Sequence, residues 1–272
     1  MSHSPQTNDR ATALEGDSSG RTPYIIAVLV FLCAAGVTLY FYYSMSNAMP
    51  MPGNWTMSMM WMPMGGELAA AAIFTVMWLA MMIAMMLPST MPMLVLYRRA
   101  AVSFGEEHLG QVMFVLGAGY FFVWTIFGVI AYVIGVLISR GAMHSAAFSR
   151  ALPLAGGLAL CAAGLYQLSP WKSACLKHCR DPLTLILHHP QRGRFGALRV
   201  GIHHGALCVA CCWGLMLIQL VLGVMNLIVM VVVAVVIAVE KLVPRGMWLA
   251  RATGLAAIAA GMVLTVLSVR SL

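Results

Sequence analysis

Forty consecutive residues, 200–239, contain no Lys, Arg, Asp or Glu. As one helix they would extend about 60 Å, at about 1.5 Å per residue, which is twice the thickness of the hydrocarbon core of a bilayer. This segment must therefore cross a membrane and return, and residues 223–226 supply the turn. Only 9% of the 272 residues are charged and 61% are hydrophobic, too few polar groups to coat a soluble globule. We predict an integral membrane protein without a large soluble catalytic domain.

The pattern of apolar runs predicts an all-α fold, a polytopic membrane helix bundle with seven transmembrane helices. A polar, disordered tail occupies residues 1–23, and the first membrane helix, an uncleaved anchor, occupies 24–43. A Met-rich outer loop at 44–67 precedes a bundle with metal-binding character at 68–272. The later apolar runs are 68–96, 112–138, 151–168, 200–239, which counts as two helices, and 255–269.

Basic residues are distributed unequally over the two sides of these seven helices. Thirteen of the 16 Lys and Arg fall on the side of the N-terminus, and only Arg140, Arg150 and Arg270 fall on the other. By the positive-inside rule the N-terminus is cytoplasmic, and we expect a multi-pass protein of the bacterial inner membrane. Because this asymmetry accounts for the net charge of +8, the lipid bilayer is the expected partner and nucleic acid is not.

Methionine is concentrated near the N-terminal end: 15 of the 23 Met lie between residues 45 and 93, eight of them in the outer loop. Thioethers favour Cu(I) over Zn(II) or hard cations, and they have no proton to lose. The alternative is that Met fills gaps in an apolar surface. Prolines at 50, 52 and 63 are expected to hold this loop open. The candidate ligands in the loop are Met57, Met59, Met60, Met62 and Met64.

The second helix continues the methionine pattern as a broad band on one side of the helix, directed inward from the outer loop. Packing is again the alternative, because a Met stripe at helical spacing is common in cores. Pro88 and Pro92 are expected to kink or end this helix near the inner surface. The band consists of Met77, Met81, Met82, Met85 and Met86.

Cysteine and histidine form one cluster in the connection after the fourth helix. Cys175, His178 and Cys179 would share a face if this connection were helical. Neighbouring Lys and Arg side chains would favour the thiolates that bind metal or react. Inert, buried cysteine is the alternative.

A second cluster lies on the fifth helix, where His204, Cys208, Cys211 and Cys212 form one stripe that continues to Gln219. Small-residue packing does not require this alignment, so we favour a metal or redox role. The second cluster is expected in the inner half of the membrane, facing the cytoplasmic connection that carries Cys175, so the two clusters are candidates for a single site. Cys33 and Cys161 are isolated and expected to pack.

Glu240 and Lys241 stand at the inner end of the sixth helix. We expect the two side chains to pair with each other and to reach toward the interface.

Several segments occur in a specific order: MWLAMMIAMMLPSTMPM at 77–93, Trp171-Lys172 with Cys175, Cys179 and Arg180, CVACCWGLM at 208–216, GVMN at 223–226, and Glu240-Lys241. In these segments the chain resembles a bacterial family of uncharacterised, predicted metal-binding integral membrane proteins. The resemblance extends from about residue 69 to 267. It implies a multi-helix membrane protein linked to metal and implies no particular reaction.

Three functions are compatible with these patterns. The first is a Cu(I)-handling protein of the inner membrane, either a transport facilitator or a protein that delivers copper to a periplasmic or membrane copper protein during cuproenzyme assembly. The second is a membrane thiol-disulfide oxidoreductase that uses the paired cysteines. The third is a structural subunit that binds nothing. The sequence has no G-x-x-x-x-G-K-[ST] loop, so we expect binding and transfer of Cu(I) without nucleotide hydrolysis, and an enzyme is the less favoured reading.

Overall fold

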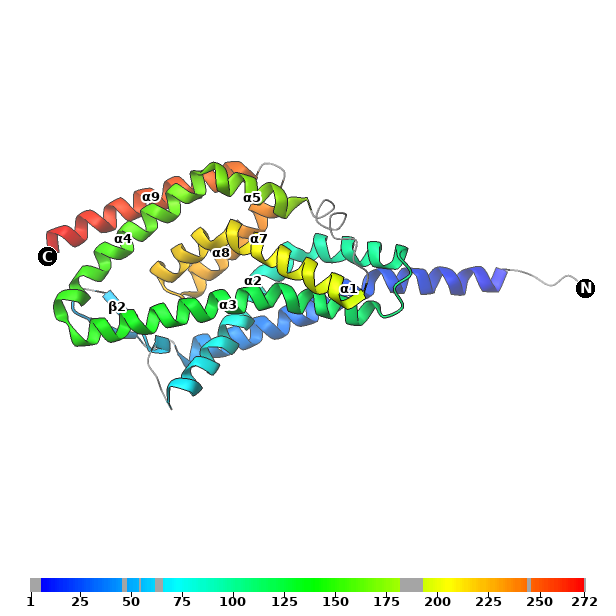
Figure 1. Ribbon diagram of the computed structural model, residues 1–272, viewed down its shortest axis with the longest axis horizontal. Coiled ribbons are helices and arrows are strands. Elements are labelled where there is room, and N and C mark those ends of the chain that lie inside the picture. The colour runs from blue at the N-terminus through cyan, green and yellow to red at the C-terminus, as the bar shows by residue number, and fades with distance from the viewer. Residues whose placement is uncertain are drawn as a thin grey trace, which may run out of the picture.

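The protein is described here by a computed structural model that covers residues 6–45, 48–53, 55–61, 66–181, 193–243 and 246–271. Helices account for nearly all of these residues, which confirms the all-α class (Figure 1). The elements in chain order are α1 (Gln6–Ser44), β1 (Ala48–Met51), β2 (Trp55–Ser58), the 3-10 helix η1 (Met59–Trp61), α2 (Glu67–Ser103), α3 (Leu109–His144), α4 (Ala146–Leu168), α5 (Pro170–Arg180), α7 (Gly193–Leu222), α8 (Leu227–Leu242) and α9 (Gly246–Ser271).

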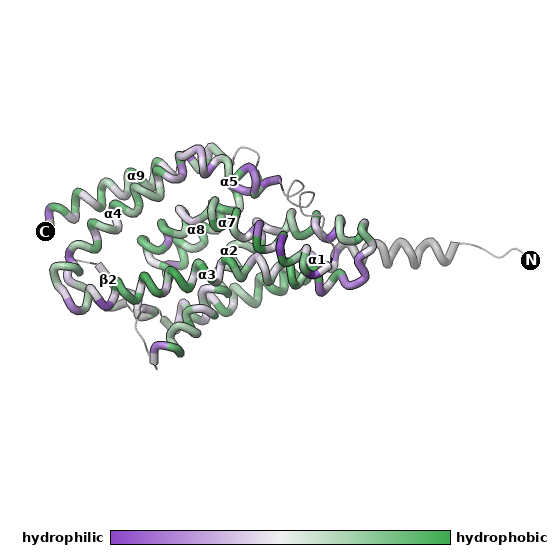
Figure 2. Tube along the Cα trace, viewed as in Figure 1, coloured by the Kyte–Doolittle hydropathy of each residue, from purple (hydrophilic) through white to green (hydrophobic). Residues whose placement is uncertain are grey.

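Six helices in the described part of the chain are long and apolar enough to cross a membrane: α1 from Arg21, α2, α3, α4, α7 and α9. Apolar residues run along all of them, whereas hydrophilic residues gather at α5 and at the helix ends (Figure 2). The protein is therefore a membrane protein. α8 has 16 residues, about 24 Å at 1.5 Å per residue, so the seventh crossing stays a prediction. α1 begins at Gln6 rather than at residue 24; the disorder and the cytoplasmic position expected for residues 1–23 also stay predictions.

The turn expected inside the 40-residue apolar run is present. α7 ends at Leu222 and α8 begins at Leu227. Gly223 has a φ of 111°, a conformation that favours glycine. The Asn226 side chain then accepts hydrogen bonds from the backbone N–H groups of Ile228 and Val229, and so caps α8.

α2 differs from the expected helix in its C-terminal half. Neither Pro88 nor Pro92 ends the helix, since α2 continues through both prolines to Ser103. A kink, the other expected outcome, stays a prediction. The hydroxyl groups of Ser89 and Thr90 donate to the carbonyl oxygen of Met86 in the same stretch. Such side-chain hydrogen bonds help membrane helices to accommodate proline.

The outer Met-rich segment is more ordered than its prolines suggest. β1 and β2 form an antiparallel hairpin in which Met49 lies opposite Met57, so the expected open backbone is wrong for residues 48–51. A two-stranded edge tolerates Pro50 because proline removes only one donor. The indole N–H of Trp55 donates to the carbonyl oxygen of Ser149 over 3.1 Å. This hydrogen bond attaches the hairpin to the beginning of α4.

Two helix pairs pack along glycine-lined faces, α4 with α9 and α3 with α7 (Figure 1). Gly157 of α4 lies against the backbone of Gly261 in α9, and Gly201 of α7 lies against the carbonyl group of Leu116 in α3. A β-carbon at Gly157 or Gly201 would collide with that backbone. Small residues allow membrane helices this close approach. The packing of α3 against α7 thereby fixes the orientation of α7 and the direction in which its cysteine-bearing face points.

Candidate metal centre

Three cysteine sulfur atoms converge on α7. The Sγ atoms of Cys208, Cys211 and Cys212 all lie within 4.8 Å of one another, and those of Cys211 and Cys212 are 3.3 Å apart. Positions i, i+3 and i+4 of a helix share one face, as the spacing predicts. The three side chains are at most 1% exposed. They form a compact, buried group of soft donors.

α5 adds a fourth sulfur to this group. The connection after α4 is helical at Pro170–Arg180, which meets the condition for a shared face, and the Sγ atom of Cys179 lies 3.6 Å from that of Cys211. Cys175 is half-buried and packs against the same core cluster. His178 is exposed, and its Nδ1 lies 2.8 Å from the carbonyl oxygen of Ala174. The structure thus joins Cys175 and Cys179 to the α7 cluster and leaves His178 away from it.

The methionine band of α2 ends at the cysteines. All five of its side chains are buried in the core cluster that contains the three α7 cysteines. The Sδ atom of Met86 lies 4.0 Å from the Sγ atom of Cys208. Nearer the N-terminal end of α2, the Sδ atom of Met81 lies 3.4 Å from the side-chain amide nitrogen of Gln219 in α7. The five side chains are Met77, Met81, Met82, Met85 and Met86.

The outer methionines are only partly described. Met57 is buried in β2, and Met60 of η1 belongs to the same core cluster as the α2 band. Met59 is the first residue of η1, whereas Met62 and Met64 lie outside the described residues. Met60 therefore places η1 against the same buried cluster as the α2 band.

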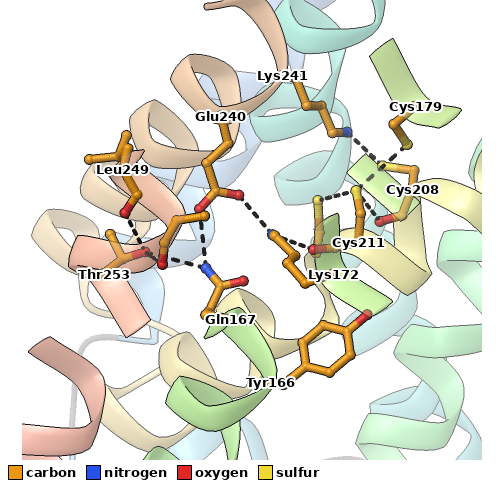
Figure 3. Close-up of polar contacts among 12 residues, drawn as sticks. Tyr166, Gln167, Lys172, Cys179, Cys208, Cys211, Glu240, Lys241, Leu249 and Thr253 are labelled. Atoms are coloured by element: carbon orange, nitrogen blue, oxygen red, sulfur yellow. Dashed lines mark hydrogen bonds and ion pairs between the residues drawn. The ribbon is translucent and has the colours of Figure 1, made fainter. Parts of the chain in front are cut away.

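A lysine and a tyrosine contact Cys208, and neither is among the site residues expected from the sequence. The Nζ atom of Lys241 lies 2.8 Å from the Cys208 Sγ atom, and the Tyr120 hydroxyl lies 2.9 Å from it. The expected pairing of Glu240 with Lys241 is wrong, because successive side chains of a helix diverge by about 100°. Lys241 points at Cys208, and Glu240 points at Lys172 of α5 (Figure 3).

Lys172, Glu240 and Gln167 form a buried polar network beside the cysteines (Figure 3). The Nζ atom of Lys172 is 2.7 Å from Glu240 Oε2, and it also donates to the carbonyl oxygen of Cys211. Gln167 donates to the other carboxylate oxygen over 3.1 Å. Burial alone would lower the pKa of Lys172, but the surrounding acidic groups, the Glu240 carboxylate among them, outweigh burial and raise it above its ordinary value. The network ties α4, α5, α7 and α8 together around the site.

His204 is one turn before Cys208 and is buried. Within the described residues, its Nδ1 atom has no hydrogen-bond partner. Its ring lies 5.6 Å, centroid to centroid, from that of Tyr120, and both side chains border a cavity of about 520 Å³ between α1, α2, α3 and α7. An unpaired imidazole nitrogen beside a thiol cluster is a candidate metal ligand.

A family model described as PpoB2, copper chaperone, matches residues 75–264. The match takes in the methionine band, both cysteine clusters and Lys241. The chain belongs to this family. Searches of the curated proteins and of the solved structures give no match. The outer hairpin precedes the matched region.

Membership of a copper chaperone family and the three converging thiols together indicate a copper-handling protein. The sulfur donors of the cysteines and methionines fit copper, because thiolates and thioethers are soft ligands that favour Cu(I). Which of the candidate side chains bind the ion stays a prediction.

Proposed function

We propose that the chain handles Cu(I) in the bacterial inner membrane and delivers it to a periplasmic or membrane copper protein. The ion is exchanged between the outer methionines, the band on α2 and the cysteine site. The contact between Met86 and Cys208 is the observation that carries this proposal. It supports a single path because it places the last thioether of the band beside the first thiol of the cluster.

The chemistry of the donors supports exchange along this path. Cu(I) accepts neutral thioethers, and thiolates bind it more tightly. The methionines of α2 carry no charge, so an ion moving along them leaves no unpaired anion behind in the apolar interior. The cysteine site is then the place where the ion is held, and the methionines are the place where it moves.

The proposed topology has seven crossings, with the N-terminus in the cytoplasm. In support, the hairpin, the α3–α4 turn and the end of α9 lie at one end of the molecule, while the beginning of α1 lies at the other end (Figure 1). In a cysteine-free background, His144→Cys should react with an impermeant maleimide in intact cells, and Ser103→Cys should not. Both positions are exposed. The reverse labelling pattern would contradict the orientation.

Copper loading of the purified full chain tests the function. Under anaerobic, reducing conditions we expect about one tightly held Cu(I) per chain, measured by competition with a chromogenic chelator. Cys208→Ser and Cys211→Ser should each abolish this binding. Cys33→Ser and Cys161→Ser are matched controls, because neither side chain lies in the cluster, and both should bind like the parent. Full loading of Cys208→Ser would refute the proposal.

One observation favours thiol-disulfide exchange as a second candidate function. The sulfur atoms of Cys179 and Cys211 lie close together although they come from different helices. Against it, Cys208 and Cys211 are fully buried, out of reach of a partner's thiol. This function predicts a Cys179–Cys211 disulfide in protein isolated without reductant, detected by mass spectrometry, together with copper content that Cys208→Ser does not change.

A further inference from the structure

A buried ammonium group faces the cysteine cluster directly. Lys241 is 9% exposed, and its Nζ atom is 2.8 Å from the Cys208 sulfur. The Tyr120 hydroxyl approaches the same sulfur from α3. A thiolate has enough lone pairs to accept these contacts and still bind a metal ion. The two groups therefore hold Cys208 in place without occupying all of its binding capacity.

The charges near the cluster are otherwise balanced among the described residues. Lys172 forms an ion pair with Glu240. Arg180 donates to the backbone carbonyl oxygen of Glu240, away from the sulfur atoms. α2 contributes the neutral Met86, and α3 contributes Tyr120. Lys241 is thus the positive charge that belongs to the thiol cluster itself.

We propose that Lys241 determines the charge selectivity of the sulfur site, favouring a monovalent soft cation over a divalent one. This inference rests on the proposed function and deepens it by naming the class of ion. Two thiolates and Lys241 together carry a net charge of −1. A bound monovalent ion brings the total to zero, whereas a divalent ion leaves an excess positive charge.

Burial makes this charge balance matter. A net charge in an apolar interior is costly, so the neutral assembly is strongly preferred. A third ionised thiol would restore neutrality for a divalent ion, but only by placing an additional anion in the same dry cluster. Without Lys241, two thiolates and a divalent ion are neutral, and the preference is reversed.

Ag(I) and Cd(II) are suitable probes because both are thiophilic ions with filled d shells and differ in charge. The purified full chain is titrated with each ion against a competing chelator, which gives the ratio of the two affinities. Lys241→Met should shift this ratio toward Cd(II) by at least about tenfold. Lys241→Gln, which keeps a polar group that can contact Cys208, should shift it in the same direction. Lys241→Arg keeps the charge and should restore most of the Ag(I) preference.

Lys177→Met is the matched control, because Lys177 is an exposed lysine of α5 and its loss should leave the ratio unchanged. An unchanged ratio in a folded Lys241→Met or Lys241→Gln protein would overturn the inference while leaving copper handling intact. An equal shift in Lys241→Arg would overturn it as well, because shape and not charge would then be responsible. Failure of the parent protein to bind Ag(I) or Cu(I) would instead refute the proposed function.

Discussion

The methionine band of α2 and the cysteine cluster of α7 meet at one contact, yet they are built differently. The band consists of neutral thioethers on one helix, enclosed by apolar neighbours. The cluster consists of thiols on α7, a helix held in place by glycine packing. An ammonium group and a phenol contact these thiols, and a buried ion pair lies beside them. A flexible thioether can exchange an ion quickly, and a fixed, charge-balanced thiolate can retain it. Under the proposed function, movement and storage of the ion therefore belong to separate helices.

The largest effect is expected from breaking the buried Lys172–Glu240 ion pair, which supports the cysteine cluster and not the methionine band. Lys172→Met leaves Glu240 buried without its counter-charge, which should lower the free energy of unfolding by about 3–5 kcal/mol. The double variant Lys172→Met/Glu240→Gln removes both charges and should recover most of that loss. Thermal unfolding of the two proteins in the same detergent measures the difference. Equal stability of the single and double variants would show that the pair does not support the site.

The second prediction compares the two sides of the Met86–Cys208 contact. Cys208→Ser should lower Cu(I) affinity by more than about 100-fold, the upper range found for losing a supporting contact to a metal ligand. Met86→Leu conserves volume and should lower equilibrium affinity by less than about tenfold, since its thioether belongs to the path. Chelator competition measures both. Equal losses in the two variants would make Met86 a ligand of the storage site and remove the distinction between the two regions.

Sequence periodicity was sufficient to predict the features that depend on a single helix or a single turn. The stripe of Cys208, Cys211 and Cys212 and the return at residues 223–226 both follow from spacing along the chain. Each of these features depends on which side chains share a helix face or which residues suit a turn. The all-α class follows in the same way from the length of the apolar runs.

Contacts between helices were not predictable from spacing. Tyr120 and Cys208 are 88 positions apart, and Lys172 and Glu240 are 68 apart. The sequence did contain one signal: lysine and glutamate next to apolar membrane segments are costly to bury and therefore mark functional sites. The expected mutual pairing of Glu240 and Lys241 hid this signal, because adjacent side chains on a helix point in different directions.

The third prediction concerns the rate of movement along α2. Met81→Leu and Met85→Leu remove buried thioethers between η1 and the cysteine cluster while conserving volume. We expect copper loading of the cluster in vesicles to slow by about tenfold or less, with the final occupancy unchanged, because neighbouring thioethers remain. Met262→Leu is the matched control, since Met262 is exposed on α9. A rate equal to that of Met262→Leu would reduce the band to packing.

The smallest effect is expected at the hairpin and η1, the outer end of the proposed path. Met60 connects η1 to the core cluster, and Met57 is buried in the hairpin. Met57→Leu/Met60→Leu should keep the fold, because leucine conserves volume and apolarity. Since each lost thioether weakens only an initial, exchangeable complex, loading at low external Cu(I) should slow by about threefold and loading at saturating Cu(I) should not change. Stopped-flow loading of oriented vesicles at two Cu(I) concentrations separates these cases. A slower rate at saturation would place these methionines on the internal path, whereas an unchanged rate at both concentrations would assign them to packing alone.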